Sequence, residues 1–499
     1  MSGYIKGKIN TKQYSLIPTC YDEMISEDNP VRVLEVFVDN LDLKKLEFKN
    51  ANRDKTIVGR PSYNPKDLLK LYLYGYFNGI RSSRKLAIEC ERNIEIFWLI
   101  NELKPDFRKN NITNMKKVFK EFSILCDSLN LIGKEIVAID GSKFRANNGR
   151  KKNYTKGKID KQIKYYEENI DKYIEILDKE DYEEKENKVK IDKQELKEKI
   201  EEAKKRVNEL EEIKKEIEQK GEISITDLDS RHMKTNNNGT DISHNVQIAV
   251  DNKAHLVVTV DVTSSPADQG QLSNIAKQTK KELEVDKITV LADKGYWNGE
   301  ELKKCAEDNI TTSVSSQKEQ GSKGYQKADF KYNKENDYYV CPMEKILHKT
   351  GVKEIKYVNR KACKECPNRE RCTSSKNGKA IHKTANDKYL EEAKVRQIEN
   401  MDLYHTRQMI VEHVFGTVKR DLGFIYFLLR GNEKVKGESF MNFLIYNIKR
   451  VCKIKGIKEI IEAIKALKRE NNSNKNKLLE LFSFFSDFFK NSVEDCTLL

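Results

Sequence analysis

The apolar residues in the first part of the chain recur at helical spacing. Asn64 and Pro65 make a helix start, because asparagine caps the first turn and proline fits within it. The apolar positions that follow are Leu68, Leu69, Tyr72, Leu73, Tyr76 and Phe77, and Gly79 ends the run. A second helix can begin after Ser82 or Ser83, and residues 112–129 have a third apolar face. The region is predicted to be helical.

Basic residues surround the second of these helices: Arg81, Arg84, Lys85 and Arg92. Two short helices joined by a glycine-containing turn, with positive charge at the start of the second, fit a helix-turn-helix. A plain helical packing domain is the alternative. We predict that residues 1–133 form a DNA-binding domain and that Arg84 contacts DNA.

The pattern then changes to strands. Residues 136–139 run into Asp140, which Gly141 follows, and residues 288–292 run into Asp293. Branched apolar residues at this density favour buried strands, and glycine lets a chain turn out of a sheet. Asp140 is therefore expected at the exposed carboxyl end of a central strand.

Two further strands, residues 243–250 and 255–262, are separated by the turn signal Asp251-Asn252, and a helix is expected near 271–283. The order strand with Asp, hairpin, helix, strand with Asp is the order of an RNase H-like α/β core. Because Mg²⁺ prefers carboxylate oxygens, two such aspartates brought together could hold the ions of two-metal phosphoryl transfer. Three basic residues beside them could hold phosphates: Lys143, Arg145 and Lys294.

Residues 156–220 interrupt this core. They are almost wholly charged or polar, with sparse apolar residues at three- and four-residue steps in two runs separated by EEKENKV. This pattern predicts two long helices paired as an antiparallel coiled coil. A solvated structural arm is the preferred interpretation, and clamping of DNA or protein is the alternative.

A second insertion is rich in cysteine. Cys341 precedes Pro342, and Cys363, Cys366 and Cys372 follow. Thiolates with a Cys-x2-Cys spacing suit tetrahedral zinc, with His348 or His382 as substitutes for one ligand. Reduced cysteines in a loop are the alternative. Ten cysteines in a chain of this length do not indicate a secreted disulfide scaffold.

The charge balance suits a polyanionic partner. The 93 Lys and Arg exceed the 79 Asp and Glu, so the net charge is +14. Nucleic acid is the simplest such partner, and solubility alone is the alternative. The first residues lack the apolar core of a signal peptide, and no stretch reaches membrane-spanning length. The protein is therefore expected to be cytoplasmic and to have no membrane partner.

The third site segment is YHTRQMIVEHVFGTVKR, from Tyr404 to Arg420. Met409, Val411, Phe415 and Val418 can give it an apolar face. Glu412 and Lys419 are seven residues apart, two turns along one side of a helix. In isolation an exposed helix with ordinary ion pairs is the better explanation of this pattern.

Together and in this order, four segments resemble the DDE transposases of bacterial insertion sequences, in the group with a helical Tyr-Arg-Glu-Lys signature. The segments are GRPSYNPKDLLKLYLYGYFNGIRSSRKLAIECERN, IVAIDGSKFRA, TVLADKGYWNGEEL and YHTRQMIVEHVFGTVKR. The resemblance implies that Asp140, Asp293 and Glu412 are catalytic and bind two Mg²⁺ or Mn²⁺ ions. It also implies that Tyr404, Arg407 and Lys419 contact DNA or steady the site. Four residues separate Arg407 from Glu412 where the commonest signature has three, which places Gln408 at the usual arginine position.

The resemblance further implies cleavage at the element ends, followed by attack of the freed 3′-hydroxyl on target DNA. The partners would be double-stranded DNA, as terminal inverted repeats and as target, with a homodimer in the synaptic complex. A similar Cys-rich insertion is frequent in such transposases. The alternatives are a metal-dependent nuclease without strand transfer and an inactive, domesticated DNA-binding protein.

These expectations define six regions: the helical domain 1–133, core segments 134–155 and 221–313, the coiled coil 156–220, the Cys-rich insertion 314–395, the catalytic-helix region 396–452 and the helical tail 453–499. The last of these ends in the aromatic segment LLELFSFFSDFFK. Packing or self-association is the preferred role for that segment, and a membrane-surface helix is the alternative.

Overall fold

The computed structural model describes residues 20–51, 63–105, 111–149, 152–183, 193–235, 239–316, 324–325, 327–333, 335–350 and 355–470. The chain forms two compact units. One contains residues 1–131, 416–425 and 433–499, and the other contains residues 132–415 and 426–432. The aromatic segment near the C-terminus lies outside the described residues. Within those residues, no helix is long and apolar enough to cross a membrane.

The first unit is helical, as predicted. Its N-terminal elements are α1 (Tyr21–Met24), α2 (Val31–Asn40), α3 (Pro65–Phe77), α4 (Ser83–Glu89), α5 (Ile94–Ile100), the 3-10 helix η1 (Ile112–Asn114) and α6 (Met115–Ser128). The side chain of Asn64 accepts a hydrogen bond at the start of α3, and that of Ser82 accepts one at the start of α4. Gly79 follows α3 with a φ of 72°, a conformation that favours glycine. The predicted helix boundaries are therefore confirmed.

A helix from the far end of the chain completes this unit. α15 (Asn432–Lys455) is buried along most of its middle, and another helix follows over residues 457–470. Phe440 of α15 meets Phe119 of α6 with ring centroids 5.3 Å apart. The N-terminal helices and α15 thus share one core, a grouping that the sequence did not indicate.

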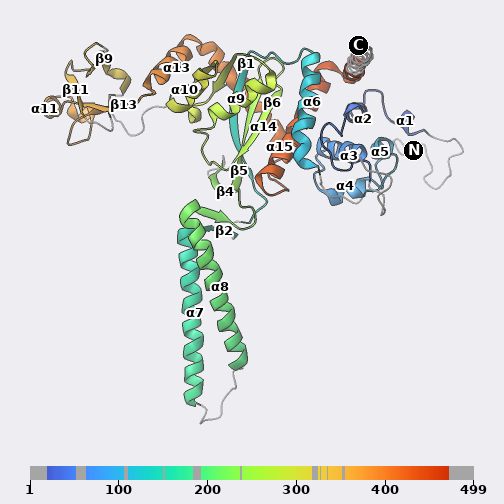
Figure 1. Ribbon diagram of the computed structural model, residues 1–499, viewed down its shortest axis with the longest axis horizontal. Helices are drawn as coiled ribbons and strands as arrows, with labels where there is room; N and C mark the ends of the chain where they lie inside the picture. The colour runs from blue at the N-terminus through green and yellow to red at the C-terminus, as the bar shows by residue number, and fades with distance from the viewer. Residues whose placement is uncertain are drawn as a thin grey trace, which may run out of the picture. The chain divides into compact units, whose positions relative to one another are not determined.

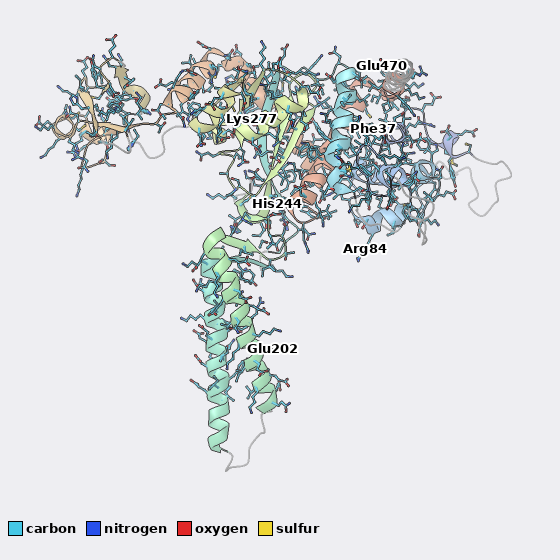
Figure 2. All side chains as sticks on the ribbon, in the orientation of Figure 1. Phe37, Arg84, Glu202, His244, Lys277 and Glu470 are labelled. Atoms are coloured by element: carbon cyan, nitrogen blue, oxygen red, sulfur yellow. The ribbon has the colours of Figure 1, made fainter. Side chains whose placement is uncertain are left out.

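Arg81 is buried in this core. The expectation that it belongs to the exposed basic residues around the second helix is therefore wrong. Its guanidinium lies 2.9 Å from the carboxylate of Glu438, donates to the carbonyl oxygen of Gly423 at 3.1 Å, and lies 5.0 Å from the ring centroid of Phe424. The Arg81 side chain is 8% exposed and that of Glu438 is fully buried. A cation held in this way cannot reach a phosphate, whereas Arg84 is exposed on α4 (Figure 2).

The second unit is built on a six-stranded mixed sheet (Figure 1). Its strands are β1 (Ile136–Arg145), β4 (Arg231–Lys234), β5 (Thr240–Asp251), β6 (Val257–Thr263), β7 (Ile288–Ala292) and β8 (Ile310–Val314). The order is β4-β5-β1-β7-β8, and β6 also pairs with β5. The pairs β1–β5 and β5–β6 are antiparallel, which confirms the predicted meander, and β7 is parallel to both β1 and β8.

Helices cover this sheet. The expected crossover helix is α9 (Leu272–Leu283), which packs on β5 and β6, and α10 (Gly299–Glu307) and α13 (Asp387–Glu399) pack beside β8. α14 (Met401–Arg420) brings Phe415 to Phe144 of β1, with ring centroids 6.1 Å apart. Because alternate residues of a strand share a face, Phe144 and Asp140 both face the side on which Phe415 packs.

The predicted end of β1 at Asp140 is wrong. The strand continues through Gly141 to Arg145, because this half pairs with β5 from Gly141–Gln247 to Arg145–Ser243. Only the parallel pairing with β7 ends earlier, after Ala138 and Leu291. Asp140 therefore lies inside a strand, at the point where one of its two neighbouring strands ends.

Two long helices interrupt the chain between β1 and β4. They are α7 (Lys156–Glu183) and α8 (Lys193–Lys220), flanked by the short paired strands β2 (Asn153–Thr155) and β3 (Glu222–Ser224). Figure 1 shows them side by side, and they pack through a small apolar cluster near their base. The buried members of that cluster are Tyr154, Ile159, Ile163, Leu210, Ile217 and Ile223. Whether the pair is a true coiled coil stays a prediction.

The Cys-rich insertion has its own five-stranded antiparallel sheet. The strands are β9 (Lys331–Asn333), β10 (Tyr338–Val340), β11 (Ile346–Thr350), β12 (Ile355–Val358) and β13 (Ala380–Lys383), with short helices α11 (Arg360–Lys364) and α12 (Arg369–Cys372). Its core is mostly aromatic: Phe330, Tyr339, Leu347, Tyr357 and Ile381. Cys341 and Cys372 pack against this core.

Candidate active site

The strand register brings Asp140 and Asp293 to the same level of the sheet. Ala138 of β1 and Leu291 of β7 are the last pair between these parallel strands, and Asp140 and Asp293 each follow two residues later. Parallel neighbours in a sheet lie about 4.8 Å apart, close enough for the two carboxylates to interact. The 153 residues between the two aspartates in the sequence thus fold so that the two side chains become neighbours.

The carboxyl group of Asp140 is in an environment that resists ionisation. Burial raises its pKa to about 6, and the nearby charges of Asp293 and Asp268 raise it as well. The backbone N–H of Gly141, which donates to the Asp140 carboxylate at 2.8 Å, and the charge of Arg407 oppose this shift. Two like charges in a partly dry site favour a bound cation.

The turn after β7 holds Asp293 in place. Its carboxylate accepts a hydrogen bond of 2.7 Å from the backbone N–H of Gly295, and it caps the 3-10 helix η3 (Lys294–Tyr296). Lys294, predicted to bind DNA, is exposed immediately beside the carboxylate. The carboxylate of Asp293 is thus held by its own turn and lies next to the solvent-exposed, positively charged Lys294.

Glu412 does not join the two aspartates directly. It lies on α14, where Arg407 is 3.3 Å from its carboxylate. The Arg407 side chain is 9% exposed and that of Glu412 is 52% exposed. The charge of Arg407 also lowers the pKa of Asp140, against the effect of burial. The unusual spacing of the two residues therefore does not prevent their contact.

Arg407 keeps one hydrogen-bond donor unused. Within the described residues, its buried Nε atom has no hydrogen-bond partner. A buried guanidinium N–H without an acceptor is costly unless a ligand supplies one.

The described residues contain no group of three or more His, Cys, Asp or Glu side chains arranged to hold a metal ion. The structure brings Asp140 and Asp293 together and leaves the Glu412 carboxylate with Arg407. The chemistry of these acids nevertheless fits a hard divalent cation, because burial and mutual repulsion leave Asp140 short of positive charge.

Asp268 is a member of the site that sequence reasoning missed. It precedes α9 in the loop SSPADQGQL, outside the four segments that carry the resemblance. Its carboxylate is 2.9 Å from the amine of Lys143 and accepts bonds of 2.8 Å from the side chains of both Asn245 and Gln247. No local pattern in the sequence indicates this role, because all four residues come together only through the pairing of β1 with β5.

The other residues predicted to bind DNA differ in accessibility. The amine of Lys143 is held by Asp268, and exposed Arg145 is 3.1 Å from Asp241. Tyr404 is half-buried on α14, and Lys419 lies four turns further along the same helix and is also half-buried. Their contact with DNA stays a prediction.

The four cysteines of the insertion lie around one pocket, as Cys341, Cys363, Cys366 and Cys372 all line it. The backbone N–H of Lys345 donates to the sulfur of Cys341 at 3.3 Å. Burial raises the pKa of the Cys372 thiol, the charge of Lys379 lowers it, and the other three thiols raise it. Of the described residues that line the pocket, none is histidine, so neither His348 nor His382 is placed there.

Two family models match the chain. Residues 340–452 match the transposase DDE domain, and residues 19–113 match a transposase domain of the family DUF772. The first match contains Glu412 and the four cysteines, whereas Asp140 and Asp293 lie outside both. Comparison with curated proteins gives no match. A solved structure, the piggyBac transposase synaptic complex with hairpin DNA, shows 8% identity and a TM-score of 0.31 over 88% of this chain and 79% of that chain, which is too low to support an argument.

Proposed function

Since the chain belongs to the DDE transposases, we propose that it cuts DNA at the ends of an insertion sequence and joins those ends to target DNA at a site formed by Asp140, Asp293 and Glu412. The observation that carries this proposal is that Asp140 and Asp293 each follow two residues after Ala138 and Leu291, the last pair between β1 and β7. The sheet order and the positions of these acids support an RNase H-like core.

In this proposal Asp140 and Asp293 hold divalent metal ions, Mg²⁺ or Mn²⁺, and Glu412 completes the ligand set after leaving Arg407. When bound, such ions supply positive charge that activates the attacking oxygen and stabilises the leaving one. Asp140 is supported by the Gly141 N–H and Asp293 by the Gly295 N–H, so both carboxylates are oriented before the ions bind.

Arg407 has a role of its own in this proposal. Its unpaired, buried Nε would donate to an oxygen of the phosphate that is cut, because that donor has no other partner among the described residues. Its contact with Glu412 keeps it in position, and its charge balances the carboxylates while no ion is bound.

Arg407→Lys is expected to lower the rate of DNA cleavage by about 10- to 100-fold, since a hydrogen bond to a charged group contributes roughly 1.5–3 kcal/mol. Lysine keeps the charge and loses the planar pair of donors. Single-turnover cleavage of a labelled element end measures the effect, with the exposed Arg420→Lys on the same helix as the matched control. Equal rates for Arg407→Lys and the wild type would contradict the phosphate contact.

The test of the proposed function is joining of a pre-cut element end to plasmid DNA. Wild-type protein with Mg²⁺ should yield joined products. Cleavage without joining would instead support the alternative, a metal-dependent nuclease, and DNA binding without either reaction would support a domesticated binding protein. The oligonucleotide ends are taken from the inverted repeats that should flank the gene.

DNA binding by the helical N-terminal unit is also part of the proposal. Arg84 and Lys85 are exposed at the start of α4, where the predicted recognition helix begins. The net charge of +14 suits the phosphate backbone. We expect a homodimer to hold two element ends together, with Tyr404, Lys419 and Lys294 near the DNA.

The cysteine pocket supports binding of one structural zinc ion. Four thiols line it, and one already accepts a backbone hydrogen bond, as a zinc-bound thiolate does. Ligation would require rotation of the thiol side chains, because they are not arranged around a common point. The small aromatic sheet beside them would then be stabilised by the metal.

Removal of this metal is expected to unfold the insertion. Protein purified without chelator should contain about one zinc per chain by elemental analysis, and a Cys363→Ser, Cys366→Ser variant should contain none. The variant should lose protection of β10 to β13 from hydrogen exchange. Cys126→Ser, at a buried thiol of the other unit, is the control. A wild-type protein free of zinc, with the same exchange pattern as the variant, would exclude the site.

A further inference from the structure

We propose that Asp268 is a positioning residue that sets the separation of Asp140 and Asp293, acting through Gly141 on one side and Tyr296 on the other. This inference rests on the proposed function, because it concerns how the two acids are held for their metal ions. It assigns a role to a carboxylate that belongs to none of the transposase signature segments.

Asp268 is saturated with donors and is therefore a support, not a free ligand. Its Oδ1 atom accepts from the Lys143 amine at 2.9 Å, from Asn245 at 2.8 Å and from Gln247 at 2.8 Å, and its Oδ2 lies 3.1 Å from the same amine. The side chains of Lys143 and Asp268 are 13% and 25% exposed. A charge-assisted bond in this half-buried place fixes the carboxylate in one orientation.

The first connection runs to Asp140. Gly141 pairs with Gln247 across β1 and β5. A Cβ atom on Gly141 would lie 2.2 Å from the Gln247 amide nitrogen and 2.6 Å from the Asp268 Oδ1, so these two side chains pack directly on the glycine backbone. The N–H of this same glycine donates to the Asp140 carboxylate. The packing thus places the donor that orients Asp140.

The second connection runs to Asp293. The hydroxyl of Tyr296 donates to the Oε1 of Gln247, the residue whose Nε2 donates to Asp268. Tyr296 is fully buried, and its backbone N–H donates to the carbonyl of Asp293 at 3.2 Å. A single chain of contacts therefore joins the strand that carries Asp140 to the turn that carries Asp293.

The network has a physical reason to exist. Productive metal geometry demands ligand positions within about 0.5 Å, yet β1 and β7 stop pairing before they reach the two acids. The amine of Lys143 pairs with Asp268, so the supporting carboxylate has a cationic partner of its own. Partners behind metal ligands typically change metal affinity or activity by about 10- to 100-fold when removed.

Tyr296→Phe and Asp268→Asn test the role in the full-length protein. Phenylalanine removes one hydroxyl, whereas asparagine replaces one carboxylate oxygen with an amide NH2 group and removes the charge that pairs with Lys143. Each change is expected to weaken Mn²⁺ binding, followed by electron paramagnetic resonance, by about 10-fold or more. Mn²⁺ binds thiols poorly, so the cysteine pocket does not interfere.

Tyr446→Phe, at a buried tyrosine of the helical unit, is the control for loss of a hydroxyl, and Asp140→Asn is the control for the site itself. We expect Tyr296→Phe to bind Mn²⁺ more weakly than the wild type. The midpoint of its thermal unfolding, measured without metal, should equal that of Tyr446→Phe. Wild-type Mn²⁺ affinity in Tyr296→Phe and Asp268→Asn, beside a loss in Asp140→Asn, would overturn the positioning role alone. Unchanged affinity in Asp140→Asn would overturn the proposed metal site as well.

Discussion

Asp140→Asn is expected to reduce both cleavage and joining of element ends by about a thousandfold or more. Asparagine keeps the shape of the side chain but supplies only one neutral oxygen to a cation. Loss of metal-based stabilisation of the transition state costs several kcal/mol, and about 4 kcal/mol corresponds to a thousandfold in rate. The measurement is the initial rate of joining of a labelled, pre-cut end to plasmid DNA.

Asp261→Asn is the matched control for this change. Asp261 is a half-buried aspartate of β6 in the same sheet, and it accepts hydrogen bonds from Asn274 and Gln278 of α9 at 2.9 and 3.3 Å. An asparagine there should leave joining within a few-fold of the wild type. Joining by Asp140→Asn at the rate of Asp261→Asn would show that Asp140 takes no part in the chemistry.

The strands and helices of the sheet were predictable because their patterns are local. Branched apolar runs marked β1 and β7, the Asp251-Asn252 turn separated β5 from β6, and a capped apolar helix marked α3. The parallel pairing of β1 with β7 ends two residues before Asp140 and Asp293, and the role of the two acids in one site stays a prediction.

The parts that sequence reasoning missed depend on contacts between distant segments. β1 continues past Gly141 because β5 remains paired with it, which a glycine in the sequence cannot reveal. Asp268 and Lys143 are 125 residues apart and meet only in the folded sheet. Arg81 resembled an exposed basic residue, but its partner Glu438 lies 357 residues away. A local sequence pattern does not indicate contacts between residues so far apart in the chain.

Arg407 and Glu412 show the same limit over a short distance. Their spacing departs from the commonest signature, so the sequence left the role of Arg407 open. In the fold the long arginine side chain spans the five positions and reaches the Glu412 carboxylate.

Glu438→Ala is expected to lower the free energy of unfolding of the helical unit by about 3–5 kcal/mol, the cost of breaking a buried ion pair by removing one partner. The Arg81 guanidinium would remain buried against Phe424 and bonded to the carbonyl oxygen of Gly423, without the carboxylate that balances its charge. The Tyr76 hydroxyl would lose its 3.4 Å contact with Glu438 as well.

Tryptophan fluorescence can follow this unit alone. The chain has two tryptophans, and in a Trp297→Phe background only Trp98 of α5 remains, stacked under Arg32 with its N–H bonded to Asp22. Urea unfolding of Glu438→Ala should therefore shift to a much lower midpoint in this signal. Glu459→Ala, which removes an exposed partner of Lys455, should change the unfolding free energy by about 1 kcal/mol or less. Equal midpoints for the two variants would mean that the Arg81–Glu438 pair adds nothing to the stability of the core.

Replacing both partners, Arg81 with Met and Glu438 with Leu, should recover most of the lost free energy of unfolding. The cost in Glu438→Ala comes from the unpaired charge of Arg81, and the double replacement removes that charge.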